Sequence, residues 1–319
     1  MYSLGIDIGG TKCAVILGKG QLPETTDGFI IDKTAFPTKV ERGYKEVLQN
    51  ILDEADKLLN KHHISANELL GIGISCGGPL NSKTGTIHCP PNLPDWDNVE
   101  IVKLFEEHFS VKTHLQNDAN ACAVAEWKFG AGKGYNNIVF LTFGTGMGAG
   151  LILDGKLYSG TSDMAGEVGH IRLSDSGPVG YGKAGSFEGF CSGGGIARLG
   201  EMLVSQAKEK GIKTELENID VLTAKNISDA AKNGDSVAKE VYRICAEKLG
   251  AGLSIIIDIL NPEVIIIGSI YQRDTEMFED IINEIISKEA LSHSSQVCRV
   301  VPAKLGNSIG DFAALGLVF

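Results

Sequence analysis

The chain has 319 residues and a formal net charge of −11, with 40 acidic and 29 basic side chains. A surface that gathers nucleic acid or anionic lipid is expected to be basic, so the charge argues against both kinds of partner. A chain of this length exceeds the size at which one hydrophobic core usually stops growing. Two lobes are therefore expected, with a cleft between them in which a ligand can bind.

Seven cysteines are scattered along the chain without a Cys-x-x-Cys pair, as expected for free thiols in a reducing compartment. The first residues lack the basic and apolar regions of a secretory signal, so a cytoplasmic location is expected. The most apolar stretch, Leu249–Leu260, is shorter than the ~20 residues of a membrane span and contains Asp258. We interpret this stretch as a core helix.

The first part of the chain reads as alternating strands and helices. Residues 2–8 alternate polar and apolar side chains and stop at Gly9-Gly10, and Cys13–Leu17 resumes as a second strand. Apolar side chains recur every three or four residues from Tyr44 to Leu59, which predicts a helix over Glu41–Lys61. The further elements predicted here are a strand at Leu69–Cys76, a helix at Val99–Phe109 and a strand at Lys112–Gln116.

The second part repeats the opening layout. After a predicted helix at Ala119–Phe129, a strand at Ile138–Phe143 leads through the turn Gly144–Gly148 into a strand at Ala149–Leu153. Later elements are helices over Gly194–Lys210 and Ser236–Leu260 and a strand at Glu263–Ile267. We expect an N-terminal lobe over residues 1–117 and a larger lobe over 118–319, with the last helix a candidate for packing back on the first lobe.

Two glycine-rich turns are candidates for binding phosphate groups. Amide N–H groups in the turn Gly9-Gly10-Thr11-Lys12 can cradle phosphate oxygens, and Asp7 offers the hard carboxylate oxygen that Mg²⁺ prefers. The turn Gly144-Thr145-Gly146 is of the same type. Neither is a Walker loop or a dinucleotide fingerprint, and each alone is also compatible with a plain hairpin.

Asp118 follows a predicted strand and precedes a predicted helix. A carboxylate in this position can accept the proton of an attacking hydroxyl group, as phosphoryl transfer requires. An aspartate there can equally be a simple helix cap.

A further polar group offers paired donors and acceptors for a polyhydroxylated ring. Its members are Asn92, Glu167, His170 and Glu188.

These separated motifs, in this order, resemble the ROK family of bacterial sugar kinases and repressors, within the actin-like ATPase superfamily. The matching residues are Asp7–Lys12, Gly78-Pro79, Pro91–Leu93 with Trp96, Asn117–Asn120 with Glu126, Gly144–Gly148, Gly155-Lys156, Ala165–His170, and Asn261–Glu263 leading to Gly268. The resemblance spans nearly the whole chain.

The resemblance implies a two-lobed α/β fold of the actin-like ATPase (ribonuclease H-like) type, with ATP and a sugar meeting in a central cleft. It implies that Asp118 is the catalytic base and that Asp7 faces Mg²⁺ through water. The residues implied to contact the sugar are Gly78, Asn92, Asn117, Asp118, Glu167, His170 and Glu188. Those implied to surround ATP are Asp7, Gly9, Gly10, Thr11, Lys12, Gly144, Thr145, Gly146 and Gly268. A homodimer is also implied.

The chain departs from the family in one segment. Family members usually carry a Cys-x-Cys-Gly-x-x-Gly-Cys pattern that binds zinc together with the histidine of the Glu-x-Gly-His motif. Here residues 179–186 read Val-Gly-Tyr-Gly-Lys-Ala-Gly-Ser, without a thiolate, so no structural zinc is expected.

Three classes of function remain open at this point. The first is an ATP-dependent kinase of a hexose or amino sugar, with glucose as first choice ahead of N-acetylmannosamine, N-acetylglucosamine, fructose and β-glucosides. The second is a sugar-sensing protein without catalysis, as in a repressor that lacks its DNA-binding domain. We expect no such domain here, because the first predicted strand begins at residue 2. The third is a chaperone or filament protein of the superfamily, against which the sugar motifs argue.

Overall fold

The computed structural model describes residues 1–319. The chain forms two compact units. The first comprises Met1–Asn136, Gly150–Ala165 and Lys304–Phe319, and the second comprises Asn137–Ala149 and Gly166–Ala303.

The first unit is built on a five-stranded sheet in the order β3-β2-β1-β4-β7. β1 pairs antiparallel with β2 and parallel with β4, and β4 pairs parallel with β7. The elements of this unit are β1 (Tyr2–Ile8), β2 (Lys12–Lys19), β3 (Ile30–Pro37), α1 (Tyr44–Lys61), β4 (Leu69–Cys76), β5 (Leu80–Asn81), β6 (Thr86–Ile87), α2 (Ile101–Phe109), β7 (Thr113–Asn117), α3 (Asp118–Phe129), β10 (Lys156–Leu157) and α10 (Ile309–Gly316).

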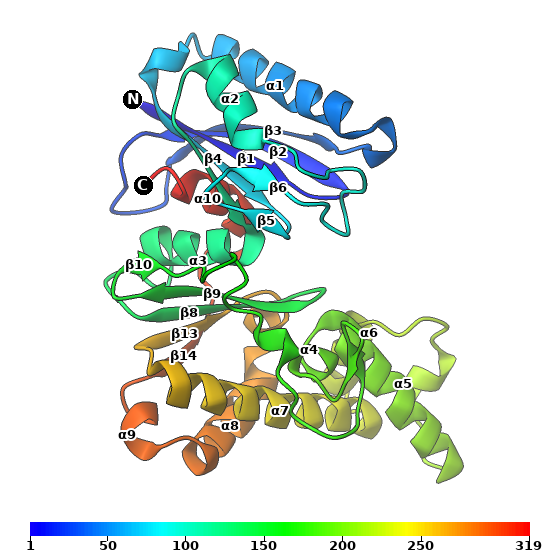
Figure 1. Ribbon diagram of the computed structural model, residues 1–319. Helices are drawn as coiled ribbons and strands as arrows, with labels where there is room; N and C mark the ends of the chain where they lie inside the picture. The colour runs from blue at the N-terminus through cyan, green and yellow to red at the C-terminus, as the bar shows by residue number, and fades with distance from the viewer. The chain divides into compact units, whose positions relative to one another are not determined.

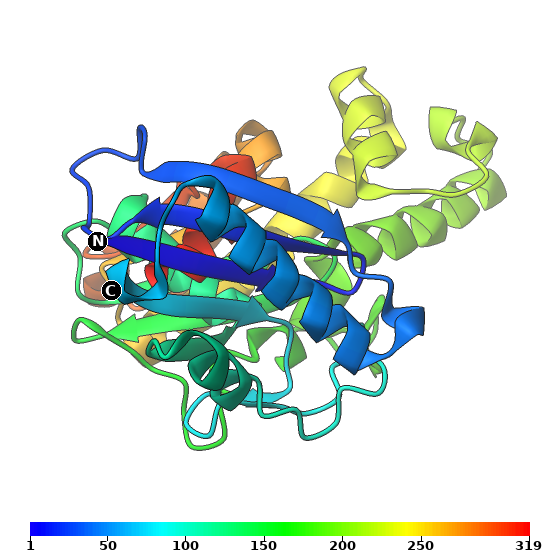
Figure 2. The same ribbon diagram turned by 90° about the horizontal axis from the view of Figure 1, so that it is seen from above.

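Helices cover both faces of this sheet, so that apolar side chains on its central strands are buried whichever way they point. α1 and α2 pack on one face, where Leu4 and Ile6 are fully buried (Figures 1 and 2). α3 and α10 pack on the other, where Ile16 lies in a cluster with Phe129 and Phe312. The last helix of the chain therefore belongs to the core of the first unit.

The second unit carries most of the second sheet, whose order is β10-β9-β8-β13-β14. β13 pairs parallel with both β8 and β14. β9 (Met147–Leu153) is shared, since its first three residues belong to the second unit and its last four to the first. The other elements of the second unit are β8 (Ile138–Phe143), β11 (Val179–Gly180), β12 (Lys183–Ala184), α4 (Phe187–Phe190), α5 (Gly193–Glu209), α6 (Ala224–Lys232), α7 (Ser236–Leu260), β13 (Val264–Ile267), α8 (Ile270–Glu289), α9 (Ser292–Ser295) and β14 (Arg299–Pro302).

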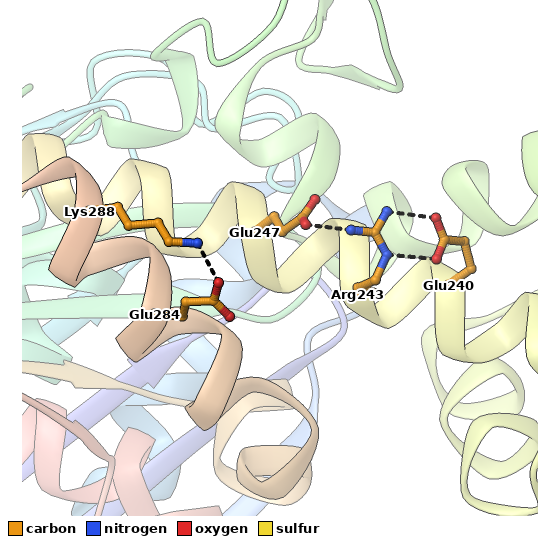
Figure 3. A network of polar contacts seen from close by, with 5 residues as sticks. All are labelled: Glu240, Arg243, Glu247, Glu284 and Lys288. Carbon is orange, nitrogen blue, oxygen red and sulfur yellow. Dashed lines mark hydrogen bonds and ion pairs between the residues drawn. The ribbon is translucent and has the colours of Figure 1, made fainter.

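The long helix α7 is the centre of the helical part of the second unit, where it packs against α8 and contacts α4, α5 and α6. Its exposed side carries ion pairs (Figure 3). Arg243 binds both carboxylate oxygens of Glu240 at 2.7 Å and also pairs with Glu247, while Lys288 pairs with Glu284 on α8. Because all five side chains are at least two-fifths exposed, solvent screens these pairs and they contribute little to stability.

The mixed α/β class predicted from the sequence is confirmed, and the predicted strands and helices appear within three residues of the expected bounds. The compact units are divided differently from the expected lobes at 117/118, because α3 and the final segment group with the first unit. Leu249–Leu260 forms the end of α7, and most of its residues are buried. None of the helices combines the length and the apolarity that a bilayer span requires.

Candidate active site

In the first unit, the parallel strands bring three sequence motifs to one edge of the sheet. Ile8 on β1 is in register with Cys76 on β4, and Cys76 with Asn117 on β7. The residues that directly follow these strands therefore emerge at the same carboxyl edge, where ligands bind in open α/β sheets. These residues are Gly9-Gly10, Gly77-Gly78 and Asp118, and a Cβ atom at Gly78 would lie 4.0 Å from that of Asn117.

The turn Gly9–Thr11 is held tightly between β1 and β2. The Gly9 N–H donates to Lys12 O at 3.0 Å, and the Thr38 hydroxyl donates to Gly9 O at 2.6 Å. A Cβ atom at Gly10 would lie 2.5 Å from the backbone oxygen of Asn92, so only glycine fits there. The structure thus brings a predicted phosphate-binding residue into contact with a predicted sugar-binding residue.

Asp7 is the last polar side chain of β1 and shares its surroundings with a residue that the sequence did not reveal. Burial and the neighbouring carboxylate of Asp311 raise the pKa of Asp7 to about 6, against the attraction of Lys33. Lys33 on β3 forms an ion pair with Asp311, which lies in the first turn of α10. No local pattern could have indicated this group, because Asp7 and Asp311 stand at opposite ends of the chain.

Asp118 is the first residue of α3, and the preceding residue Asn117 caps the helix. The Asn117 side-chain oxygen accepts the Asn120 N–H at 2.8 Å, and Asn120 in turn donates to Gln116. The Asp118 carboxylate accepts the N–H of the adjacent residue Ala119 at 2.8 Å. Its side chain is exposed to solvent, yet the protein around it removes enough water to raise its pKa. A carboxylate with a raised pKa at a helix start is suited to accept a proton.

In the second unit, the turn after β8 lies beside the residue that follows β13. Leu141 is in register with Ile267, and the Gly268 N–H donates to Leu141 O at 3.0 Å. A Cβ atom at Gly144 would lie 3.4 Å from the hydroxyl of Ser269, which has a positive φ of 58°. Such a backbone conformation is uncommon for residues other than glycine and often marks a functional position. Ser269 was not predicted as a site residue.

Glu188 contacts this second turn directly. Its carboxylate accepts the Met147 N–H at 3.1 Å, and a Cβ atom at Gly146 would lie 2.9 Å from the same oxygen. Gly169 packs under the turn, because a Cβ atom there would lie 2.3 Å from Met147 O. The short 3₁₀ helix Val168–His170 is thereby held against the turn, with Glu167 exposed at its start.

His170 lies beside the segment in which the family's thiolates are missing. Its ring meets the ring of Tyr181 edge to face at 5.1 Å between centroids. No group of three or more His, Cys, Asp or Glu side chains comes together there, or elsewhere in the chain, as a metal site requires. The absence of zinc in the protein itself stays a prediction.

A cavity of about 650 Å³ lies in the first unit away from these residues. Its walls include Lys83, Lys128 and Trp127, with the Lys128 ammonium 3.6 Å from the centre of the Trp127 ring. None of the predicted site residues lines it. This cavity is therefore not the candidate active site, whose residues lie at the strand edges and in the glycine turns.

The sequence profile of the ROK family matches residues 3–318. The chain belongs to the ROK family.

Individual relatives include enzymes and regulators. A glucokinase of Halalkalibacterium halodurans is 34% identical over 97% of this chain and 92% of its own length. A xylose repressor of Caldicellulosiruptor bescii is 31% identical over 90% of this chain and 70% of its own length. The crystal structure of a ROK family glucokinase from Streptomyces griseus, in complex with glucose and AMPPNP, is 28% identical with a TM-score of 0.75 over 99% of both chains. The fold is that of the actin-like ATPases.

Proposed function

We propose that this chain is an ATP-dependent kinase that phosphorylates a hydroxyl group of a hexose or amino sugar, with glucose as the first choice. The observation that carries the proposal is the division of labour at the start of α3. Asn117 caps the helix, so the carboxylate of Asp118 is left for catalysis at the edge that also carries the turn Gly9–Thr11. A helix capped by an asparagine does not require an acidic residue in the next position.

In the proposed reaction, Asp118 accepts the proton of the sugar hydroxyl group as its oxygen attacks the γ-phosphorus of ATP. The bond between that phosphorus and the bridging oxygen breaks, and ADP leaves with the electron pair. Asn92, Asn117 and Gly78 hold the sugar in the first unit. The amide groups of Gly9, Gly10 and Thr11 and the ammonium of Lys12 bind phosphate oxygens.

In the second unit, the proposal assigns one group of residues to the sugar and another to ATP. Glu167, His170 and Glu188 accept from and donate to sugar hydroxyl groups, while Gly144, Thr145 and Gly146 bind phosphates and Gly268 lies near the adenosine. The contact of Glu188 with Met147 supports this assignment, because it connects a residue assigned to bind the sugar with a turn assigned to bind phosphates, inside one unit. A movement of the Glu188 carboxylate would then also displace the turn that contains Met147.

The residues present fit a magnesium ion that accompanies ATP. Asp7 supplies a hard carboxylate beside the glycine turn, and the raised pKa of Asp7 reflects a site where a nearby positive charge would be favourable. Bound Mg²⁺ would neutralise charge on the phosphate oxygens. We assign Asp7 to hold it, through water.

The choice of glucose follows from the relatives, since two of those described above are glucokinases. A kinetic screen tests it: the purified chain is given ATP, Mg²⁺ and one sugar at a time, and ADP release is coupled to a dehydrogenase. The panel contains glucose, N-acetylmannosamine, N-acetylglucosamine, fructose and a β-glucoside. We expect sugar-dependent ADP release with the highest kcat/KM for glucose.

The similarity to the xylose repressor favours a second candidate, a sugar-sensing protein without catalysis. Calorimetric binding of a sugar without ADP release from any member of the panel would support this candidate over the kinase. ADP release that is independent of sugar would instead favour the third class, an ATPase of the chaperone or filament kind. We also propose a homodimer, which light scattering of the purified protein tests.

A further inference from the structure

The hairpin β11–β12 contacts His170 in two ways. Tyr181, at its tip, lies edge to face against the imidazole, and the Lys183 ammonium donates to the backbone oxygen of His170 at 2.7 Å. One contact fixes the ring and the other fixes the main chain from which the ring extends. Both come from a segment that is remote from His170 by more than ten residues.

Tyr181 occupies an unfavourable position for a tyrosine. The hairpin pairs Val179 with Ala184 and Gly180 with Lys183, so Tyr181 and Gly182 form a two-residue loop. Both have positive φ, 43° and 76°, as type I′ turns require, and asparagine followed by glycine is the usual choice. Tyr181 is also 75% exposed. Neither the turn nor burial therefore explains a large aromatic side chain here, whereas the contact with His170 does.

The rest of the segment is organised to keep the hairpin still. Arg172 donates to Ala184 O at 2.7 Å, and the Ser186 hydroxyl donates to Gly180 O at 3.3 Å. Leu173 and Ser174 both donate from their backbones to Gly185 O. The two-residue loop is thus presented on a base with satisfied hydrogen bonds, which is what a positioning element needs.

We propose that Tyr181 is a positioning residue for substrate binding, which holds the imidazole of His170 in the orientation that binds the sugar. Lys183 assists it by fixing the backbone of His170. This inference rests on the proposed function insofar as His170 binds sugar, but the contact itself can be measured without catalysis. The orientation of the His170 ring is thus set by packing against the ring of Tyr181.

Three substitutions separate positioning from folding. Tyr181→Ala removes the ring, Tyr181→Phe keeps it without the hydroxyl group, and Tyr181→Asn removes it while suiting the positive φ. We expect the alanine and asparagine variants to raise the KM for the sugar roughly 2- to 12-fold, the range that an aromatic pair contributes. The KM for ATP stays within twofold, and the phenylalanine variant behaves as wild type. The asparagine variant should unfold at the same temperature as wild type or higher.

The second readout is the NMR signal of the His170 ring protons at fixed pH, assigned by its loss in His170→Asn. Tyr181→Ala and Tyr181→Asn should move this signal to the position of a solvated imidazole, because the ring current of Tyr181 is gone, and Tyr181→Phe should leave it in place. If the His170 signals respond in this way but the protein phosphorylates no sugar, the proposed function is wrong while the contact between Tyr181 and His170 stands. An active kinase in which Tyr181→Ala changes neither the signal nor the sugar KM would overturn the inference alone.

Discussion

The two glycine turns occupy equivalent places in their sheets but differ in charge. Each follows the strand that pairs in parallel with a later strand, β1 with β4 and β8 with β13. Two residues before the first turn stands Asp7, a carboxylate with a raised pKa. The equivalent residue before the second turn is Thr142, whose hydroxyl group accepts the Gly148 N–H at 2.8 Å.

The two turns of the same type therefore have different chemical surroundings. The first turn has a fixed acidic group beside it and rests on the backbone of Asn92, so it is suited to a metal–phosphate ligand. The second is closed by the flexible side chain of Glu188, which reaches it from α4. We therefore expect substitutions at the first turn to affect folding and metal binding, and substitutions at the second to affect the sugar through Glu188.

The largest effect should come from Asp118, the proposed catalytic base in the first unit. Asp118→Asn keeps the size of the side chain and removes the proton acceptor, so we expect kcat to fall by about 10²- to 10⁴-fold. Binding of both substrates, measured by calorimetry, should change little. Asp229→Asn, which makes the same change at an exposed position of α6 outside the proposed site, serves as the control and should leave kcat unchanged. Wild-type turnover in Asp118→Asn would show that another group accepts the proton.

Asp7 should make the first turn sensitive to pH when no metal is present. Its raised pKa means that the folded protein binds a proton here which the unfolded chain has already released between pH ~4 and ~6. Its contribution to the free energy of unfolding therefore falls as the pH rises through that interval. The rise in the pKa of Asp7 corresponds to a loss of at most ~3 kcal/mol in the free energy of unfolding.

Asp7→Asn should consequently be more stable than wild type above pH 6 and about equal to it below pH 4. Thermal unfolding in EDTA across pH 4 to 8 measures this. Asp311→Asn is the matched variant, since removal of the second carboxylate should weaken the pH dependence of the wild-type chain. Equal melting temperatures of Asp7→Asn and wild type at pH 7.5 would contradict the argument.

An added methyl group should distinguish the two turns. In Gly10→Ala the new Cβ atom meets the backbone oxygen of Asn92 at 2.5 Å, which cannot move alone, so we expect a loss of about 1–3 kcal/mol in stability. In Gly146→Ala it meets the end of the Glu188 side chain at 2.9 Å, which can rotate away. Stability should change by less than ~1 kcal/mol, while the KM for sugar rises.

Urea unfolding and steady-state kinetics of both alanine variants make this comparison. The prediction fails if Gly146→Ala loses as much stability as Gly10→Ala, or if its sugar KM is unchanged.

The smallest effect concerns zinc. Because residues 179–186 contain no thiolate, we expect elemental analysis of protein purified without added metal to find no stoichiometric zinc. Chelation followed by restoration of Mg²⁺ should then leave activity unchanged. Activity that returns only after zinc is added would refute this interpretation of the segment.

Much of the fold could be predicted because its signals are local. The apolar spacing from Tyr44 to Leu59 and the glycines that end β1 and β8 depend only on neighbouring residues, and α1 and both turns appear where expected. The strand β3 was not predicted, although its side chains alternate between exposed and partly buried positions. The last helix was a candidate for packing back on the first lobe, and α10 does contact β1 and α3. The sequence did not indicate these particular partners, because they are far away along the chain.

The sequence by itself indicated the candidate residues for chemistry: Asp118 after its strand, the two glycine turns, and the polar groups around His170 and Glu188. Only the tertiary structure decided how these groups are supported. The parallel register of the strands places Gly9, Gly78 and Asp118 at one edge of the sheet. Asn117 caps the helix, and the ring of Tyr181 contacts the ring of His170. Asp311 joined Asp7 in the same way. Motifs are readable because they depend on adjacent residues, whereas these contacts join segments that only packing brings together.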